Sequence, residues 1–147
     1  MLKLTKLTPK AICLILASCI FAEISAQEVI PTPVEISVKS EKNVKIRKID
    51  AATDTGLNLP DEGYTLDIQG NTAILRSKTE QGLVWARATL EQLKDADGKV
   101  PQVKILDYPA FPIRGFMHDT GRNFRPVEML KKEIELFSSY KLNVFHW

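Results

Sequence analysis

One short polar loop, Asp119-Thr120-Gly121-Arg122-Asn123, contains residue types that could hold a ligand. Arg122 carries a guanidinium, which presents several donors in a fixed planar arrangement and can hold two hydroxyl groups at once. Asp119 stands three residues before it, and composition alone favours a structural ion pair between the two. The elements on either side decide whether the loop could also form a binding site.

The loop lies between a predicted strand and a predicted helix. Residues 113–118 are mostly apolar with turn residues on both sides, which is typical of a strand buried on two faces. Pro126 suits a first helical position, and the apolar residues after it recur at helical spacing: Met129, Leu130, Ile134, Phe137 and Tyr140. Residues 143–147 form a second apolar run, and a strand that returns after one helix lies parallel to the first. The pattern therefore predicts a βαβ unit.

A βαβ unit of this kind needs further elements to cover it. Both of its strands are predicted to be buried on two faces, which requires more strands and helices than this region supplies. We therefore expect the 147-residue chain to be the front part of a longer protein.

Three blocks of the same region resemble one known family. They are Phe111-Pro112-x-Arg114-Gly115, Asp119-x-x-Arg122, and Lys141-Leu142-Asn143-Val144-Phe145-His146-Trp147. Their spacing is kept over about 37 residues, which is more specific than a single short motif. They resemble the opening of the catalytic barrel in glycoside hydrolase family 20, the β-N-acetylhexosaminidases. The preceding segment is similar to the small α+β domain that comes before that barrel.

The resemblance implies a fold class and a domain order. The expected fold is a small α+β domain at 27–109, followed at 110–147 by the first βαβ unit of an incomplete (β/α)₈ TIM barrel. Within the small domain, alternating apolar and polar residues and short apolar runs predict strands at 34–38, 44–47, 64–68, 72–77 and 103–106. A helix that Thr79 caps is predicted between the last two strands.

The resemblance also implies roles for residues at the carboxyl ends of barrel strands, where TIM barrels hold their reactive groups. Arg122 is expected to grip the ring hydroxyls of a terminal sugar. Asp119 is expected to orient Arg122, and His146 is a possible neighbour of the site. Family members use an adjacent Asp-Glu pair on a later strand, whereas Asp61-Glu62 here lies in a loop and is expected to form a turn. No catalytic residue and no metal ligand is therefore expected in this chain.

In the family the glutamate of that pair protonates the leaving oxygen, and the aspartate positions the substrate's own 2-acetamido group for attack on the anomeric carbon. This retaining route needs no cofactor and no metal. The resemblance implies that the full-length protein removes terminal N-acetylglucosamine or N-acetylgalactosamine from glycans, and that residues 1–147 alone are inactive. Two alternatives remain: a secreted carbohydrate-binding or interaction module without catalysis, and another exported barrel hydrolase with a different sugar preference.

The first 26 residues are predicted to be a signal peptide. Three lysines precede an apolar core at 11–22, and Ser25-Ala26 offers small residues for cleavage. That core is shorter than the roughly 20 apolar residues that span a bilayer. The chain is therefore expected to be exported to the periplasm or secreted. The alternative is a membrane-anchored lipoprotein, because Leu16-Ala17-Ser18-Cys19 has the pattern of a lipoprotein processing site. Contact with a membrane is expected only if Cys19 is lipidated.

The charge of the mature chain bears on its partners. Cleavage after Ala26 removes three lysines, one glutamate and both cysteines, which leaves 17 basic and 17 acidic residues from the 20 and 18 of the whole chain. The mature chain then has no cysteine for a disulfide. A net charge near zero without a basic cluster argues against nucleic acid as a partner. Glycans with a terminal N-acetylhexosamine are the expected partners.

Overall fold

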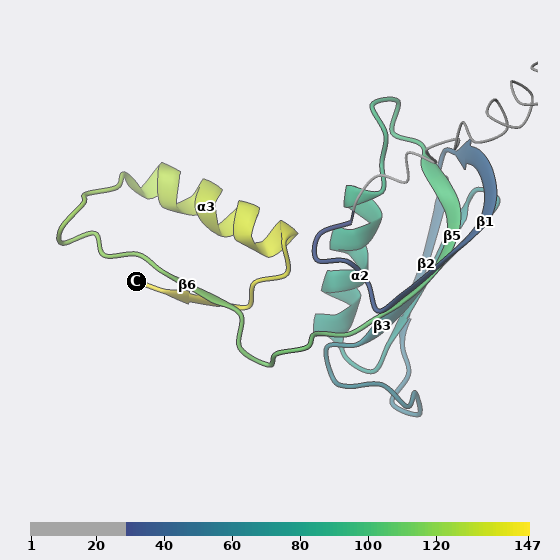
Figure 1. Ribbon diagram of the computed structural model, residues 1–147, viewed down its shortest axis with the longest axis horizontal. Helices are drawn as coiled ribbons and strands as arrows, with labels where there is room; N and C mark the ends of the chain where they lie inside the picture. Colours follow the sequence, from purple (N-terminus) through teal and green to yellow (C-terminus); the bar gives the residue numbers. More distant parts are fainter. Residues whose placement is uncertain (1–28) are drawn as a thin grey trace, which may run out of the picture.

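The computed structural model describes residues 29–147. The predicted signal peptide, its cleavage site and Cys19 lie outside the described residues. Figure 1 shows a sheet covered by one helix, joined through an extended segment to a second helix that lies over two short strands. The elements in order are β1 (Glu35–Val44), β2 (Lys48–Thr53), β3 (Tyr64–Gln69), β4 (Thr72–Ser77), α2 (Glu80–Gln92), β5 (Val100–Asp107), β6 (Gly115–Met117), α3 (Val127–Ser139) and β7 (Val144–His146).

The sheet has five strands in the order β1-β5-β3-β4-β2. Its pairs are antiparallel except for β2 with β4, which run parallel. β3 and β4 form the predicted hairpin, with Tyr64 opposite Ser77 and Gln69 opposite Thr72. The apolar residues of β3, β4 and β5 face α2 and make the core, because an amphipathic helix buries its apolar face against one side of a sheet. The core includes the fully buried side chains of Leu66, Ile68, Leu75, Val100 and Ile105.

The start of α2 is fixed by contacts that the sequence predicts in part. Thr79 is the N-cap, as predicted, and its Oγ1 accepts a hydrogen bond of 3.3 Å from the backbone N–H of Gly82. Gly82 packs directly on Ser77 at the end of β4, since a Cβ at position 82 would lie 1.9 Å from Ser77 Oγ. Ser77 Oγ in turn donates to the carbonyl oxygen of Gly63 at 2.6 Å. The hairpin, the loop before it and the helix therefore meet at one close-packed point.

One strand prediction is wrong. The pattern at 44–47 predicts a strand, but Val44 ends the long strand β1, and the next strand begins only at Lys48. Val44 and Ile46 nevertheless both pack against the core. The alternation thus predicts burial correctly. Residues 45–47 are not a strand, because they carry the chain from β1 at one edge of the sheet to β2 at the other. β1 itself has two register irregularities, between Val38 and Ser40 and between Ser40 and Val44.

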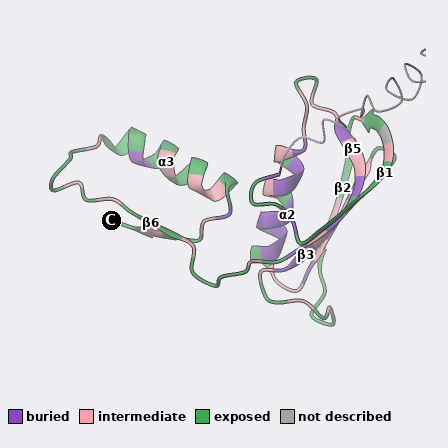
Figure 2. Ribbon diagram, viewed as in Figure 1, coloured by how far each residue is buried: buried purple, intermediate pink, exposed green. Residues whose placement is uncertain are grey.

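The βαβ unit forms as predicted. β6 and β7 pair in parallel, with Gly115 opposite Val144 and Met117 opposite His146. α3 covers one face of the pair through aromatic contacts, in which the ring of Phe137 lies 4.6 Å from Phe116 and 6.4 Å from Phe145. Met117, on the other face, is 66% exposed. Figure 2 shows most of this region as exposed or intermediate, in contrast to the buried residues of α2. The predicted burial on two faces is therefore wrong for the described residues, because α3 covers its face of these strands only in part and leaves Phe116 40% exposed.

Across residues 29–147, neither helix is both long and apolar enough to cross a membrane.

Candidate functional site

The loop after β6 is shaped by Asp119. Its Oδ1 accepts hydrogen bonds from the backbone N–H groups of Gly121 at 3.0 Å and Arg122 at 3.2 Å. This is an Asx-type turn, in which the short carboxylate takes over backbone donors that would otherwise face solvent. The loop thus owes its form to Asp119.

The side chain of Arg122 extends into solvent. It is 90% exposed, and its Nε lies 3.4 Å from Asp119 Oδ2. An exposed ion pair of this kind contributes at most about 1 kcal/mol, so a ligand could displace it at little cost. The remaining donors of the guanidinium have no partner among the described residues. Arg122 is therefore available to bind at the carboxyl end of β6.

His146 belongs to the same end of the strand pair. Phe145 packs toward α3, so the next residue along the strand points to the opposite, open face. There His146 lies beside Met117, its register partner on β6. Beyond it, Trp147 Nε1 donates to Thr120 Oγ1 at 2.9 Å and ties the end of β7 to the loop. The structure thus brings His146 and the loop of Arg122 to one edge.

His118 has a different environment. It faces α3, where its Nδ1 lies 3.5 Å from Glu133 Oε2 and its ring lies 6.1 Å from that of Phe116. This placement supports a packing function for His118. The described residues also contain no group of three or more His, Cys, Asp or Glu side chains placed to hold a metal ion.

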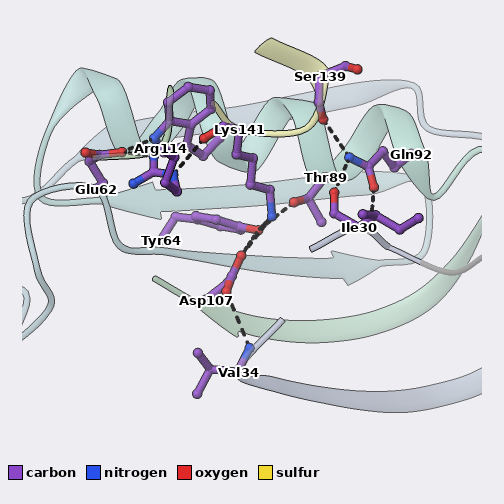
Figure 3. A network of polar contacts seen from close by, with 11 residues as sticks. Ile30, Val34, Glu62, Tyr64, Thr89, Gln92, Asp107, Arg114, Ser139 and Lys141 are labelled. Atoms are coloured by element: carbon purple, nitrogen blue, oxygen red, sulfur yellow. Dashed lines mark hydrogen bonds and ion pairs between the residues drawn. The ribbon is translucent and has the colours of Figure 1, made fainter. Parts of the chain in front are cut away.

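A second set of polar contacts lies at the other, amino-terminal end of the same strands, and it was not predicted (Figure 3). Glu62 is its first centre: Oε2 accepts from Arg114 Nη2 and from Trp85 Nε1 at 2.6 Å, and Oε1 accepts from Asn143 Nδ2 at 3.1 Å. Burial would raise the pKa of the Glu62 carboxyl, but the hydrogen bonds from Arg114, Trp85 and Asn143 outweigh it and lower that pKa. We call these four residues the Glu62 cluster.

Lys141 is the second centre. Its Nζ lies 2.8 Å from Asp107 Oδ2 and donates to Tyr64 Oη at 2.9 Å, while the Tyr64 hydroxyl donates to Asp107 Oδ2 at 2.8 Å and lies 2.5 Å from Thr89 Oγ1. Burial lowers the pKa of Lys141, an effect that Asp107 opposes. Burial and the neighbouring Asp107 charge raise the pKa of Tyr64, which keeps its hydroxyl neutral and able to donate. We call these four residues the Lys141 cluster.

The two clusters border a cavity of about 310 Å³ between the sheet and the βαβ unit. Its lining is mainly apolar and includes Tyr64, Trp85, Tyr108 and Phe111. The charged groups on its wall already pair with one another, and the cavity lies at the strand ends opposite the Arg122 loop. The cavity therefore belongs to the junction between the sheet domain and the βαβ unit, and not to the candidate sugar site at the Arg122 loop.

Sequence reasoning found the turn at Asp61-Glu62 but missed the partners of Glu62. Arg114, Lys141 and Asn143 stand in the family blocks, where they served only to recognise the resemblance. The sequence did contain one signal for these contacts: charged and amide side chains stand beside short apolar strands, and such side chains need hydrogen-bond partners when they are buried. Those partners are distant in sequence, however, and periodicity could not identify them.

Two family models match the chain. The model described as glycosyl hydrolase family 20, domain 2, matches residues 26–108, and the model described as glycosyl hydrolase family 20, catalytic domain, matches residues 111–147.

Curated relatives agree with these matches. A beta-hexosaminidase of Porphyromonas gingivalis is 38% identical over 104 residues, which cover 64% of this chain and 13% of that protein. A beta-hexosaminidase of Emericella nidulans is 40% identical over 112 residues, which cover 71% of this chain and 18% of that protein. The chain thus spans less than a fifth of the length of these relatives.

A solved structure agrees as well. The exo beta-N-acetylglucosaminidase of Vibrio harveyi, in complex with N-acetylglucosamine, matches with a TM-score of 0.72 at 26% identity, over 83% of this chain and 25% of that one. The beta-N-acetylhexosaminidase of Bacteroides fragilis, at 24% identity and a TM-score of 0.73, has a similar fold over the matched region. Since the domain 2 model alone matches over half of the residues and the catalytic-domain model follows it directly, the chain belongs to glycosyl hydrolase family 20.

Proposed function

We propose that this chain is the N-terminal portion of an exo-acting β-N-acetylhexosaminidase, a glycoside hydrolase that removes terminal N-acetylglucosamine or N-acetylgalactosamine from glycans. Its curated relatives are beta-hexosaminidases, and the match to the catalytic-domain model begins at residue 111. The small share of each relative that the chain covers supports the further proposal that most of the barrel comes from sequence not included in these 147 residues.

The exposed guanidinium of Arg122 is the observation that carries the proposal. It is exposed to solvent at the carboxyl end of β6, in a loop that Asp119 holds in shape, beside the end of β7. That is the end at which TIM barrels place their substrates. Arg122 would hold two hydroxyl groups of the terminal sugar, Asp119 would keep the loop in position, and His146 would lie near the bound ring.

The reaction itself is proposed to use groups outside this chain. In substrate-assisted retaining hydrolysis, one carboxylic acid protonates the leaving oxygen and a second carboxylate positions the 2-acetamido group, whose carbonyl oxygen attacks the anomeric carbon. Asp61-Glu62 is the one adjacent Asp-Glu pair in the sequence, and Glu62 is held by three donors at the junction. Residues 1–147 are therefore expected to bind sugar weakly and to hydrolyse nothing.

We also propose that the protein is exported, to the periplasm or beyond the cell, through the signal peptide at residues 1–26. The alternative is a lipid anchor on Cys19. Mass spectrometry of the mature N-terminus separates the two, because the first proposal requires a chain that begins at Gln27 and the second requires a lipid-modified Cys19.

The activity is tested by a comparison of two aryl glycosides with the purified complete gene product. We expect turnover of an aryl N-acetyl-β-glucosaminide and at most trace turnover of the aryl β-glucoside, which lacks the acetamido nucleophile. Sugar binding without turnover would support the non-catalytic module instead. Preferential turnover of the plain glucoside would support a barrel hydrolase with another sugar preference.

A further inference from the structure

We propose that the small sheet domain positions the first two strands of the catalytic barrel, and that Arg114 and Lys141 are the positioning residues. This goes beyond the proposed activity, because it assigns a task to a domain that carries none of the reacting groups. It rests on the two clusters at the amino-terminal ends of β6 and β7.

The starts of β6 and β7 contact each other directly. The carbonyl oxygen of Arg114 accepts from the backbone N–H groups of Asn143 at 2.9 Å and Val144 at 3.2 Å. Asn143 Oδ1 accepts from the backbone N–H of Arg114 at 2.9 Å, and Arg114 Nε donates to the carbonyl oxygen of Lys141 at 2.8 Å. These bonds fix the starts of β6 and β7 relative to each other, just before each strand begins.

Glu62 and Trp85 tie the paired starts of β6 and β7 to the sheet domain. Glu62, in the loop before β3, accepts from both Arg114 and Asn143, so one carboxylate holds both strands. Trp85 of α2 donates to the same carboxylate, and its ring lies 5.7 Å from the guanidinium carbon of Arg114. The Arg114 and Glu62 side chains are only 16% and 20% exposed, so solvent screens their interaction little.

The side chain of Lys141 inserts into the sheet domain. Lys141 follows α3 with a φ of 62°, a conformation that non-glycine residues rarely adopt. This backbone turn directs the side chain to Asp107 at the end of β5 and to Tyr64 at the start of β3. The residue is 6% exposed, so its charge requires those partners in one arrangement.

A shift at these contacts would reach the sugar site, because β6 is short. Asp119 lies five positions after Arg114, which is about 17 Å of extended chain. We expect a strand this short to move as a rigid unit, so that a tilt at its start displaces the Arg122 loop at its end. Displacements of about 1 Å can cost enzymes about 100-fold in rate. Buried charges with fixed partners suit this task better than an apolar contact that tolerates sliding.

The test replaces the buried pair by apolar side chains in the complete gene product, as Lys141→Met with Asp107→Leu. Hydrogen exchange is measured for amides of α3 and β7 and for amides of β3 and β4, and kcat/KM is measured with an aryl N-acetyl-β-glucosaminide well below the melting temperature. The matched control is Arg76→Met with Asp50→Leu, an ion pair that joins β4 to β2 within the sheet domain.

We expect the junction variant to keep the protection of β3 and β4, to exchange at least about tenfold faster in α3 and β7, and to lose about 10- to 100-fold in kcat/KM. The control should leave exchange in α3 and β7 and kcat/KM unchanged. Unchanged exchange in α3 and β7 of the junction variant would overturn the proposal, as would an equal rise in all four elements, which a merely structural role predicts.

Two provisions keep the test decisive. If the double variant does not fold, Glu62→Gln weakens the other cluster with little change of shape, and the same exchange pattern decides. If the unmodified gene product hydrolyses no N-acetylhexosaminide, the proposed function fails, but hydrogen exchange still decides whether the sheet domain positions the strands.

Discussion

Lys141 Nζ and Asp107 Oδ2 lie 2.8 Å apart, and their side chains are only 7% and 11% exposed. Lys141 lies in the turn between α3 and β7, and Asp107 is the last residue of β5 in the sheet domain. The contact therefore joins the two bodies of this family 20 chain through a desolvated ion pair. A single substitution at either position would leave the other charge buried without its partner.

Lys141→Met should lower the free energy of unfolding by about 3–5 kcal/mol, because it leaves the Asp107 carboxylate uncompensated beside Tyr64. Urea unfolding of the complete gene product measures the change. Lys94→Met is the matched control, since Lys94 pairs with Glu91 on an exposed helix end, where the pair is worth less than about 1 kcal/mol. A loss at position 141 no larger than that of the control would contradict the described burial of the pair.

Glu62 should make the junction sensitive to acid. Its folded pKa is lowered below the ordinary value of 4.5, so its contribution is fully present above pH 4.5 and is lost as the pH falls through the lowered value. Glu62→Gln should therefore reduce the drop in unfolding free energy between about pH 5 and pH 3. Asp61→Asn, at the exposed neighbouring position, is the control. Equal drops in Glu62→Gln and the unmodified protein would show that the Glu62 cluster does not hold the carboxylate in its charged form.

Gly82→Ala should destabilise the sheet domain by about 1–3 kcal/mol. The added methyl would lie 1.9 Å from Ser77 Oγ and 2.7 Å from the carbonyl oxygen of Gly63, so α2 would have to move off β4. Gly56→Ala is the control, since its Cβ would meet only Asp54 Oδ1 at 3.2 Å. Thermal unfolding reports both variants, and an equal shift in melting temperature for the two would rule out the close approach at Gly82.

Sequence reasoning predicted the elements whose signals are local. Thr79 and the helix after it, the hairpin of β3 and β4, and the βαβ unit all follow from capping, alternation and helical spacing within about a dozen residues. The length of β1 could not be predicted, because its pairing with β5 depends on residues that lie more than 50 positions away. Pairing at that distance leaves no trace in a local pattern.

The polar contacts differ in the same way between local contacts and contacts with residues distant in sequence. The Asx turn of Asp119 involves neighbours within three residues. Asp119 and Arg122 were chosen as site residues because the block Asp119-x-x-Arg122 resembles a motif of the family. The partners of Lys141 lie 34 and 77 residues away, so its buried position depends on how the two bodies meet. Lysine is usually exposed, and a local pattern gives no reason to expect it buried.

The open guanidinium of Arg122 is central to the account, and its removal in the complete gene product is the most direct test. Arg122→Ala should lower kcat/KM for an aryl N-acetyl-β-glucosaminide by about 10- to 100-fold, the loss of one charged hydrogen-bonding group, while the free energy of unfolding changes by less than about 0.5 kcal/mol. Lys132→Ala, at an exposed position of α3, should leave both quantities unchanged. An unchanged kcat/KM in Arg122→Ala would contradict the account and leave Arg122 with only its exposed ion pair to Asp119.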